Sequence, residues 1–405
     1  MVTRRSHTKS RNGCRDCKRR KVKCDEAYPS CFNCTRHGIP CSLSTSGASP
    51  SRTTHHSPSF TQSTSSSSPE TPYQFLDVVI SHAEPTPQQP TIKLWGHGLE
   101  LMHHYTLHTA NTISLRHKTQ HVWRVIVPEI GYDCPFVAHG ILAMAALHKA
   151  YLLPPERDRY LDLATSHLDA GLEGFRALLH TIDETNWQPF FCFATLVTFY
   201  VACVPAHDGG GGRHVPDITA LFVFVRGVRT ILEPYQERLG RTKLAPLVEG
   251  PWTVEPGDPE YENPALHHSP LPRDIFEALS RLAAFFEDHL EGDARDDYAV
   301  AVTELRKVAC LVAHAGASPE ISMVVFWLYR VSDGVMADVQ TAAPHAMVLV
   351  SHFAVLLCAV ERIYWFFQGW SRHLLDAAEM RLAGLPVFAA ALEWPKKQIL
   401  ELYAH

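Results

Sequence analysis

Six cysteines near the start of the chain constrain its fold more than any other feature. They are Cys14, Cys17, Cys24, Cys31, Cys34 and Cys41, with the spacing C-x2-C-x6-C-x6-C-x2-C-x6-C. A shift of 17 residues places the first three on the last three, so the segment is a tandem duplicate in which each half supplies three thiols. Because a segment this short cannot bury an adequate apolar core, it needs a metal or covalent cross-links to fold.

The number of sulfurs predicts two Zn2+ ions. Structural zinc takes four tetrahedral ligands, so one ion would leave two thiols over and two separate ions would need eight. Six thiolates serve two ions if two sulfurs bridge, and metal binding then supplies the folding free energy. A disulfide knot is the alternative that six cysteines permit. The N-terminal sequence MVTRRSHTKSRNG lacks the apolar core of a secretory signal, which predicts a chain that is not exported and keeps its thiols reduced.

A basic run, KRRKVK, lies between Cys17 and Cys24 and supplies the cations Lys18, Arg19, Arg20, Lys21 and Lys23. A charge run alone often marks a solvated face or an import signal. Here two metal ligands flank it, so its side chains project from a rigid turn of helix, which suits phosphate contacts and pairing with guanine edges in the major groove. Residues 1–45 hold 11 Lys/Arg and 3 Asp/Glu, a formal charge of +8, while the rest of the chain carries −13. This asymmetry is typical of a nucleic-acid-binding head on an acidic body.

The rest of the chain divides into a polar stretch and a helical body. Residues 42–72 contain 18 Ser/Thr and 4 Pro in 31 positions, a composition that predicts a disordered, flexible linker. From about residue 92 apolar residues recur with a helical period and strand-like alternation is scarce, so we expect an all-α body. The expected helices are 97–114, 135–153, 157–182, 187–204, 217–234, 273–291, 297–314, 319–339, 344–368 and 371–384. The apolar runs 190–204 and 343–360 are interpreted as buried helices, not membrane spans.

The cysteine segment resembles the fungal binuclear zinc-cluster (Zn2Cys6) transcription factors. The resemblance rests on the cysteine spacing, the basic run, Pro29 and Pro40, and it covers residues 11–43. It implies a metal-held head of two short helices in which Cys14 and Cys31 bridge the two zinc ions.

The same resemblance implies roles for the basic residues. Arg20 and Lys21 would read a CGG-like triplet in double-stranded DNA, and Lys18, Arg19 and Lys23 would mainly hold phosphates. Arg20 stands where many family members have lysine.

Four segments of the body are similar to the regulatory domain of the fungal sterol-uptake-control-type regulators: 99–110, 135–150, 221–232 and 345–375. This resemblance implies an all-helical regulatory domain over most of 92–400 that binds an apolar small molecule. Relatives of that group regulate pathway gene clusters instead of sterol genes.

Several body residues admit two interpretations. Aromatic runs at 190–200 and 364–370 either wall an apolar pocket or fill the core, and Arg226 and Glu361 either form a pair or face solvent. His104 and His108 have i, i+4 spacing and could hold a third metal with His97. The acidic stretch 287–297 either recruits partners or forms an inter-helix loop. The five remaining cysteines are interpreted as inert buried thiols: Cys134, Cys192, Cys203, Cys310 and Cys358.

Together these patterns predict a nuclear, sequence-specific RNA polymerase II transcription regulator. We expect a DNA-binding domain at 1–43, a Ser/Thr/Pro-rich linker at 44–91 and a helical regulatory domain at 92–405. The expected partners are promoter DNA, the transcription machinery, an apolar effector and a second copy bound through the body, with sterol or secondary-metabolite genes as targets.

No catalytic motif is present: the sequence has no Walker loop, G-x-S-x-G or dinucleotide fingerprint, and we expect no enzyme activity. One alternative function is a zinc- or redox-responsive interaction protein that does not bind DNA. An enzyme with a zinc-finger appendage is the other, and it would need a polar pocket in the body.

Overall fold

The computed structural model describes residues 14–20, 22, 24–27, 30–36, 39, 41–42, 91–203, 218–248 and 264–404. The linker predicted at 44–91 therefore lies outside the described residues except for Thr91. By contacts between backbone positions the chain divides into two units, Met1–Pro69 and Glu70–His405. The first unit contains two short helices, α1 (Arg15–Arg19) and α2 (Phe32–Arg36), as the resemblance implied.

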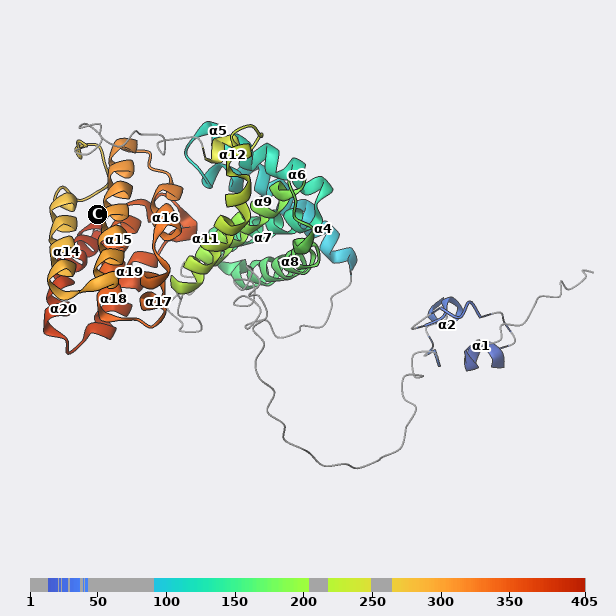
Figure 1. Ribbon diagram of the computed structural model, residues 1–405. Helices are drawn as coiled ribbons and strands as arrows, with labels where there is room; N and C mark the ends of the chain where they lie inside the picture. Colours follow the sequence, from blue (N-terminus) through green and yellow to red (C-terminus); the bar gives the residue numbers. More distant parts are fainter. Residues whose placement is uncertain are drawn as a thin grey trace, which may run out of the picture. The chain divides into compact units, whose positions relative to one another are not determined.

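The second unit, the body, is built in its described part from helices joined by turns and short loops (Figure 1). Its elements are α4 (Thr91–His104), η1 (Tyr105–Thr109), η2 (Ala110–Thr112), α5 (His117–His121), η3 (Val122–Ile126), α6 (Val127–Asp133), α7 (Pro135–Leu152), η4 (Pro154–Glu156), α8 (Arg157–Leu178), η5 (Leu179–Thr181), α9 (Trp187–Ala202), α11 (Ile218–Leu232), η6 (Glu233–Tyr235), α12 (Gln236–Leu239), η7 (Ala245–Leu247), α14 (Ile275–His289), α15 (Gly292–Ala315), α16 (Ile321–Arg330), α17 (Asp333–Gln340), α18 (Pro344–Glu361), η9 (Trp365–Phe367), α19 (Trp370–Leu382), α20 (Pro386–Ala391) and α21 (Glu393–Ala404). No strand occurs among the described residues, so the all-α prediction is confirmed.

The helices of the body form two packed groups that share one core. In the first group α7 contacts α4, α6, α8 and α9, and in the second α18 contacts the helices from α14 to α17 and from α19 to α21. Helix α11 joins the groups, because it packs on α9 in the first and on α16 and α17 in the second (Figure 1).

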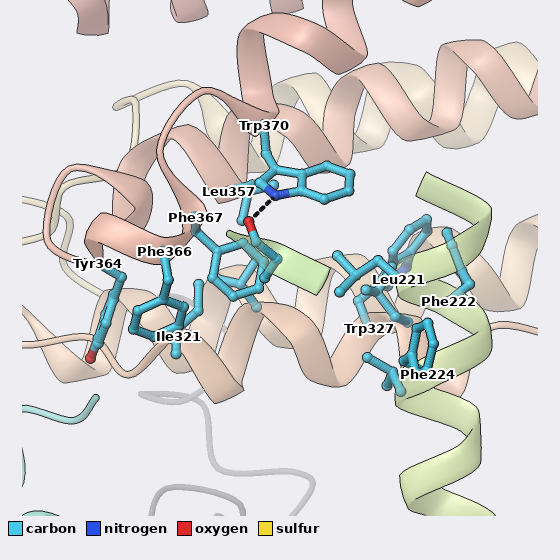
Figure 2. Close-up of a cluster of buried hydrophobic side chains, with 14 of the residues drawn as sticks. Leu221, Phe222, Phe224, Ile321, Trp327, Leu357, Tyr364, Phe366, Phe367 and Trp370 are labelled. Atoms are coloured by element: carbon cyan, nitrogen blue, oxygen red, sulfur yellow. Dashed lines mark hydrogen bonds between the residues drawn. The ribbon is translucent and has the colours of Figure 1, made fainter. Parts of the chain in front are cut away.

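Aromatic side chains fill the contact between the two groups (Figure 2). The ring of Trp327 on α16 lies 5.9 Å from that of Phe222 on α11 and 4.7 Å from that of Phe353 on α18, measured between centroids. The buried indoles of Trp327 and Trp370 both have hydrogen-bond partners. Trp327 Nε1 donates to the Ala301 carbonyl at 2.9 Å, and Trp370 Nε1 donates to the Ala202 carbonyl at 2.7 Å. Large rings with satisfied N–H groups are well suited to a buried contact between helix groups.

The core interpretation of the aromatic runs is confirmed. The buried members are Phe190, Phe191, Phe193, Tyr364, Trp365, Phe366, Phe367 and Trp370, and the half-buried Phe199 and Tyr200 pack against them. Four of the scattered cysteines are buried as expected, whereas Cys134 is only half-buried.

Expected and observed helices differ at several places, among them the expected helix 344–368, whose α-helical part, α18, ends at Glu361. The expected helix 319–339 breaks after Arg330, because the Ser332 hydroxyl accepts the Val335 N–H at 3.3 Å and starts α17 as its N-cap. The short helices between 117 and 133 and those after 385 were not predicted. The acidic stretch 287–297 spans the junction of α14 and α15, where only Leu290 and Glu291 lie between the two helices and the rest of the stretch is helical.

The predictions for Arg226 and Glu361 are wrong. Arg226 forms an ion pair with Asp333 on α17 rather than with Glu361. Glu361 does not face solvent either: it is 2% exposed and accepts hydrogen bonds from the Ser371 N–H at 3.0 Å, the Ser371 hydroxyl at 2.7 Å and the Tyr403 hydroxyl. Burial raises the pKa of this carboxyl, and the hydrogen bonds from Tyr403 and Ser371 oppose that rise.

Helix α18 is the one described helix long and apolar enough to cross a membrane by length and composition. Its apolar stretch is 89% buried within the body. That burial is typical of a central core helix, which agrees with the interpretation of 343–360.

Candidate metal centre and nucleic-acid interface

The sulfur atoms of the six N-terminal cysteines gather into two groups of four. One group is Cys14, Cys17, Cys24 and Cys31, and the other is Cys14, Cys31, Cys34 and Cys41. Within each group all sulfur atoms lie within 4.8 Å of one another, and all six cysteines are buried. The two groups share Cys14 and Cys31, the pair that the resemblance implied as bridges.

The internal repeat is visible in the backbone as well as in the sequence. The Cys14 N–H donates to Cys24 Sγ at 3.4 Å, and 17 residues later the Cys31 N–H donates to Cys41 Sγ at 3.4 Å. In the same way, the Val22 N–H donates to the Cys17 carbonyl at 3.1 Å and the Ile39 N–H to the Cys34 carbonyl at 3.2 Å. The two halves therefore fold alike around the sulfurs.

The spacing of the sulfurs fits tetrahedral zinc. Zinc–sulfur bonds of about 2.3 Å in a tetrahedron place sulfurs ~3.8 Å apart. The observed distances are 3.6 Å for Cys14–Cys31 and 3.5 Å for both Cys14–Cys34 and Cys17–Cys31. A disulfide bond needs about 2.05 Å between sulfurs, and none of the eleven cysteines, all of which are described, forms one. The disulfide alternative is therefore wrong.

The protonation of the thiols couples to metal binding. Burial raises the pKa of Cys14, but hydrogen bonds from the Cys17 N–H and from neighbouring thiols outweigh it and bring the pKa to about 6. Burial and the contacts with other sulfurs raise the pKa of Cys17 and Cys34. Because zinc binds thiolates, loading of the site releases protons and becomes stronger as pH rises.

Two residues that the sequence analysis did not single out complete the head. The Asp25 carboxylate accepts the N–H of Phe32, the first residue of α2, at 3.0 and 3.1 Å. The Ser42 hydroxyl accepts the N–H of Arg15, the first residue of α1, at 2.7 Å. Asp25 and Ser42 are 17 residues apart, and each directly follows the third cysteine of its half. The 17-residue repeat is therefore the sequence feature from which they could have been predicted.

Three of the five basic site residues lie within the described part. Lys18, Arg19 and Arg20 are exposed on α1 and at its C-terminal end. Arg19 forms an ion pair with Asp16 at 2.8 Å while its side chain stays 73% exposed. Lys21 and Lys23 lie outside the described residues.

The third metal site is not formed. Within the described residues only the two cysteine groups bring three or more potential ligand atoms together. The ring of His104 instead lies against those of His108 and His148, at 5.1 Å between centroids in both cases. Burial lowers the pKa of His104 to about 4.

Both regions match known protein families. Residues 12–48 match the fungal Zn(2)-Cys(6) binuclear cluster domain, which binds two zinc ions, and residues 100–203 match the fungal specific transcription factor domain. These families consist of transcription factors, not enzymes.

Relatives support both assignments. A Zn(2)-C6 fungal-type transcription factor of Gibberella zeae is 27% identical over 98% of this chain and 86% of its own length. The Zn(2)-C6 fungal-type transcription factor afumD of Aspergillus fumigatus is 31% identical over 48% of this chain and 46% of its own. Sterol uptake control protein 2 of Candida albicans is 58% identical, but over only 9% of this chain and 5% of its own, in the cysteine segment.

The cysteine geometry and the matches lead to the same assignment. Six cysteines are arranged to hold metal in two groups that share two sulfurs, and the family of that segment binds two zinc ions. The match at 100–203 and the relative that spans nearly the whole chain extend the likeness into the helical body. The chain therefore carries a fungal Zn(2)-Cys(6) binuclear cluster domain and a fungal specific transcription factor domain, and the pair supports a DNA-binding transcription regulator.

Proposed function

We propose that this chain reads a CGG-like site in promoter DNA through α1 and the basic residues that follow it. Arg20 and Lys21 are the base-reading residues, Lys18, Arg19 and Lys23 hold phosphates, and Cys14 and Cys31 bridge the two zinc ions. The observation that carries this proposal is the exposure of Lys18, Arg19 and Arg20 on a helix whose first turn is built from the sulfur site.

Because the head is a repeat, its first helix, α1, can be compared with its second, α2. The two halves share their backbone hydrogen bonds, so α1 and α2 are equivalent supports. The two helices differ in charge. Arg36 is the one basic residue of α2, whereas the first half carries five cations between Cys17 and Cys24. Only the first half therefore combines a rigid support with the charge density that phosphate and guanine contacts need.

Titration of the full chain against a CGG duplex and a scrambled duplex tests the assignment. Arg20→Ala and Lys21→Ala should each abolish most of the preference for CGG, a loss of ~1–3 kcal/mol per bidentate base contact. Lys23→Ala should weaken binding to both duplexes alike and reduce the slope of log K against log salt by about one unit. Gel-shift titrations at several salt concentrations measure both effects.

Arg36→Ala is the matched control, since it removes an exposed cation from the equivalent helix of the second half. It should leave the preference for CGG unchanged. Intact discrimination in Arg20→Ala and Lys21→Ala would refute the base-reading assignment. No salt-dependent DNA binding by the unaltered chain would favour the zinc- or redox-responsive alternative instead.

The proposal also divides the chain and places it in the cell. Residues 1–43 bind DNA, 44–91 form the linker, and 92–405 form the regulatory domain of a nuclear RNA polymerase II regulator.

One zinc cluster makes few DNA contacts, so we also propose that the protein binds DNA as a homodimer formed through the body. Sedimentation of the full chain as a monomer at DNA-binding concentrations would contradict the dimer. Target genes in sterol or secondary metabolism are a further part of the proposal, which mapping of bound genomic sites tests.

An apolar groove supports a sensing role for the body. It has a volume of about 800 Å³ and lies among α4, α6, α7 and α8, with Leu99, Met102, Ile141 and Leu142 among its lining residues. Its volume falls within the range of small-molecule sites, and its lining is largely apolar. A ligand with a large apolar surface, sterol-like in shape, is the effector class we propose.

Filling the groove tests this role. Leu142→Trp should lower the affinity of the full chain for a fluorescent sterol at least ten-fold, because the indole occupies the volume that the ligand would take. Val300→Trp adds the same ring at an exposed position of α15 and should have no effect. A fluorescence titration that gives equal affinities for the unaltered chain and Leu142→Trp would exclude this groove.

A further inference from the structure

In the head, a side chain from each half accepts the first N–H of the helix in the other half, and this contact is called a cap below. Asp25 belongs to the first half by sequence, yet its carboxylate accepts the N–H that starts α2 in the second half. Ser42 belongs to the second half, and its hydroxyl accepts the N–H that starts α1 in the first half, at 2.7 Å. Each cap directly follows the third cysteine of its own half.

These contacts complete the first turn of each helix. In α1 the Cys17 N–H is accepted by Cys14 Sγ at 3.3 Å, so the sulfur site itself serves that donor. The Arg15 N–H has its acceptor in Ser42, which the chain reaches only after passing through all six cysteines. The start of α1 is therefore fixed partly by sulfur and partly by a residue at the far end of the head.

We infer that Ser42 is a positioning residue for DNA recognition: by capping α1 from the opposite half, it fixes the direction in which Lys18, Arg19 and Arg20 point. Asp25 has the equivalent role for α2, which carries no basic run. This inference rests on the proposed function, because it assumes that α1 presents the DNA-contacting side chains.

The Ser42 hydroxyl affects the orientation of the cations but not their number. Loss of the Ser42 cap leaves every charge in place, so binding through phosphates alone should persist. Base contacts depend on direction as well as charge, so the preference for a particular sequence should fall. Loss of one hydrogen bond of this kind should shift the opening equilibrium of the first turn of α1 by about five-fold.

The experiment uses the full chain with saturating zinc and a reducing agent. Ser42→Ala should speed amide hydrogen exchange in the peptide that contains Arg15 about five-fold and should lower affinity for a CGG duplex by a similar factor. Affinity for a scrambled duplex and a content of two zinc ions should not change. Ser42→Thr and Ser42→Asp, which restore an oxygen acceptor at the same place, should recover slow exchange.

Two further variants serve as controls. Asp25→Ala should speed exchange in α2 rather than in α1 and should leave the ratio of the two DNA affinities unchanged. Ser30→Ala removes another serine hydroxyl of the head, one that accepts from the Thr35 hydroxyl at 3.3 Å, and should change neither readout.

Unchanged exchange in Ser42→Ala would show that this hydroxyl does not hold α1. Faster exchange with an unchanged ratio of affinities would make Ser42 a stabilising residue only, and either result overturns the inference. If the unaltered chain does not prefer CGG, the proposed function fails as well, while the exchange data still decide whether the cap crosses between the halves.

Discussion

Replacement of Cys14 or Cys31 by serine should remove both zinc ions from the head, whereas replacement of Cys17 or Cys41 should remove only one. Cys14 and Cys31 belong to both groups of four sulfurs, so losing either leaves two groups of three. Losing an outer cysteine leaves the other group complete, with its four ligands. Because structural zinc contributes ~10–16 kcal/mol to the folding of small zinc domains, all four variants should also lose DNA binding.

Elemental analysis of the purified full chain under reducing conditions measures this difference. The unaltered chain should hold two zinc ions, and the half-buried Cys134 of the body supplies the control, because Cys134→Ser should keep both. Equal loss of zinc from all four variants would contradict the assignment of Cys14 and Cys31 as bridges.

The head could be predicted from the sequence because its chemistry is a matter of ligand count and spacing. Six cysteines in a 17-residue repeat predict two metals and shared sulfurs, and the structure places the sulfurs accordingly. The caps escaped prediction although the repeat relates them. Asp25 and Ser42 are different residue types, and each accepts the first N–H of the helix in the other half.

The body could be predicted as helical but not in its details. Pro135 and Pro344 mark the first residues of α7 and α18, as expected for proline at a helix start. The segment 117–133 was missed because a polar start, His117–His121, and a π-helical turn, Val122–Ile126, interrupt the simple period. Periodicity carries no information on partners, which is why Arg226 and Glu361 were assigned wrongly.

Glu320 is the clearest case of a contact that no local pattern reveals. This carboxylate, 5% exposed at the start of α16, accepts the Ser114 hydroxyl at 2.9 Å and the N–H groups of Leu115 at 3.0 Å and Arg116 at 2.9 Å. The Tyr364 hydroxyl donates to its second oxygen at 3.2 Å. Glu320 therefore ties a turn of the first helix group, more than 200 residues away in sequence, to the second group.

Glu320→Ala should lower the free energy of unfolding of the body by ~3 kcal/mol, because it leaves buried donors without an acceptor. Glu320→Gln keeps one carbonyl oxygen for Ser114, Leu115 and Arg116 and should cost only about 1 kcal/mol. Urea unfolding followed by circular dichroism measures both.

Exposed Glu277 on α14 provides the reference, and Glu277→Ala should change stability by less than about 0.5 kcal/mol. A loss in Glu320→Ala no larger than in Glu277→Ala would mean that the carboxylate does not hold the two helix groups together. The difference between the alanine and glutamine variants isolates the accepted hydrogen bonds from the negative charge, since glutamine retains the acceptor and removes the charge. The contact that Glu320 makes between the two helix groups should therefore depend on the acceptor oxygen more than on the charge.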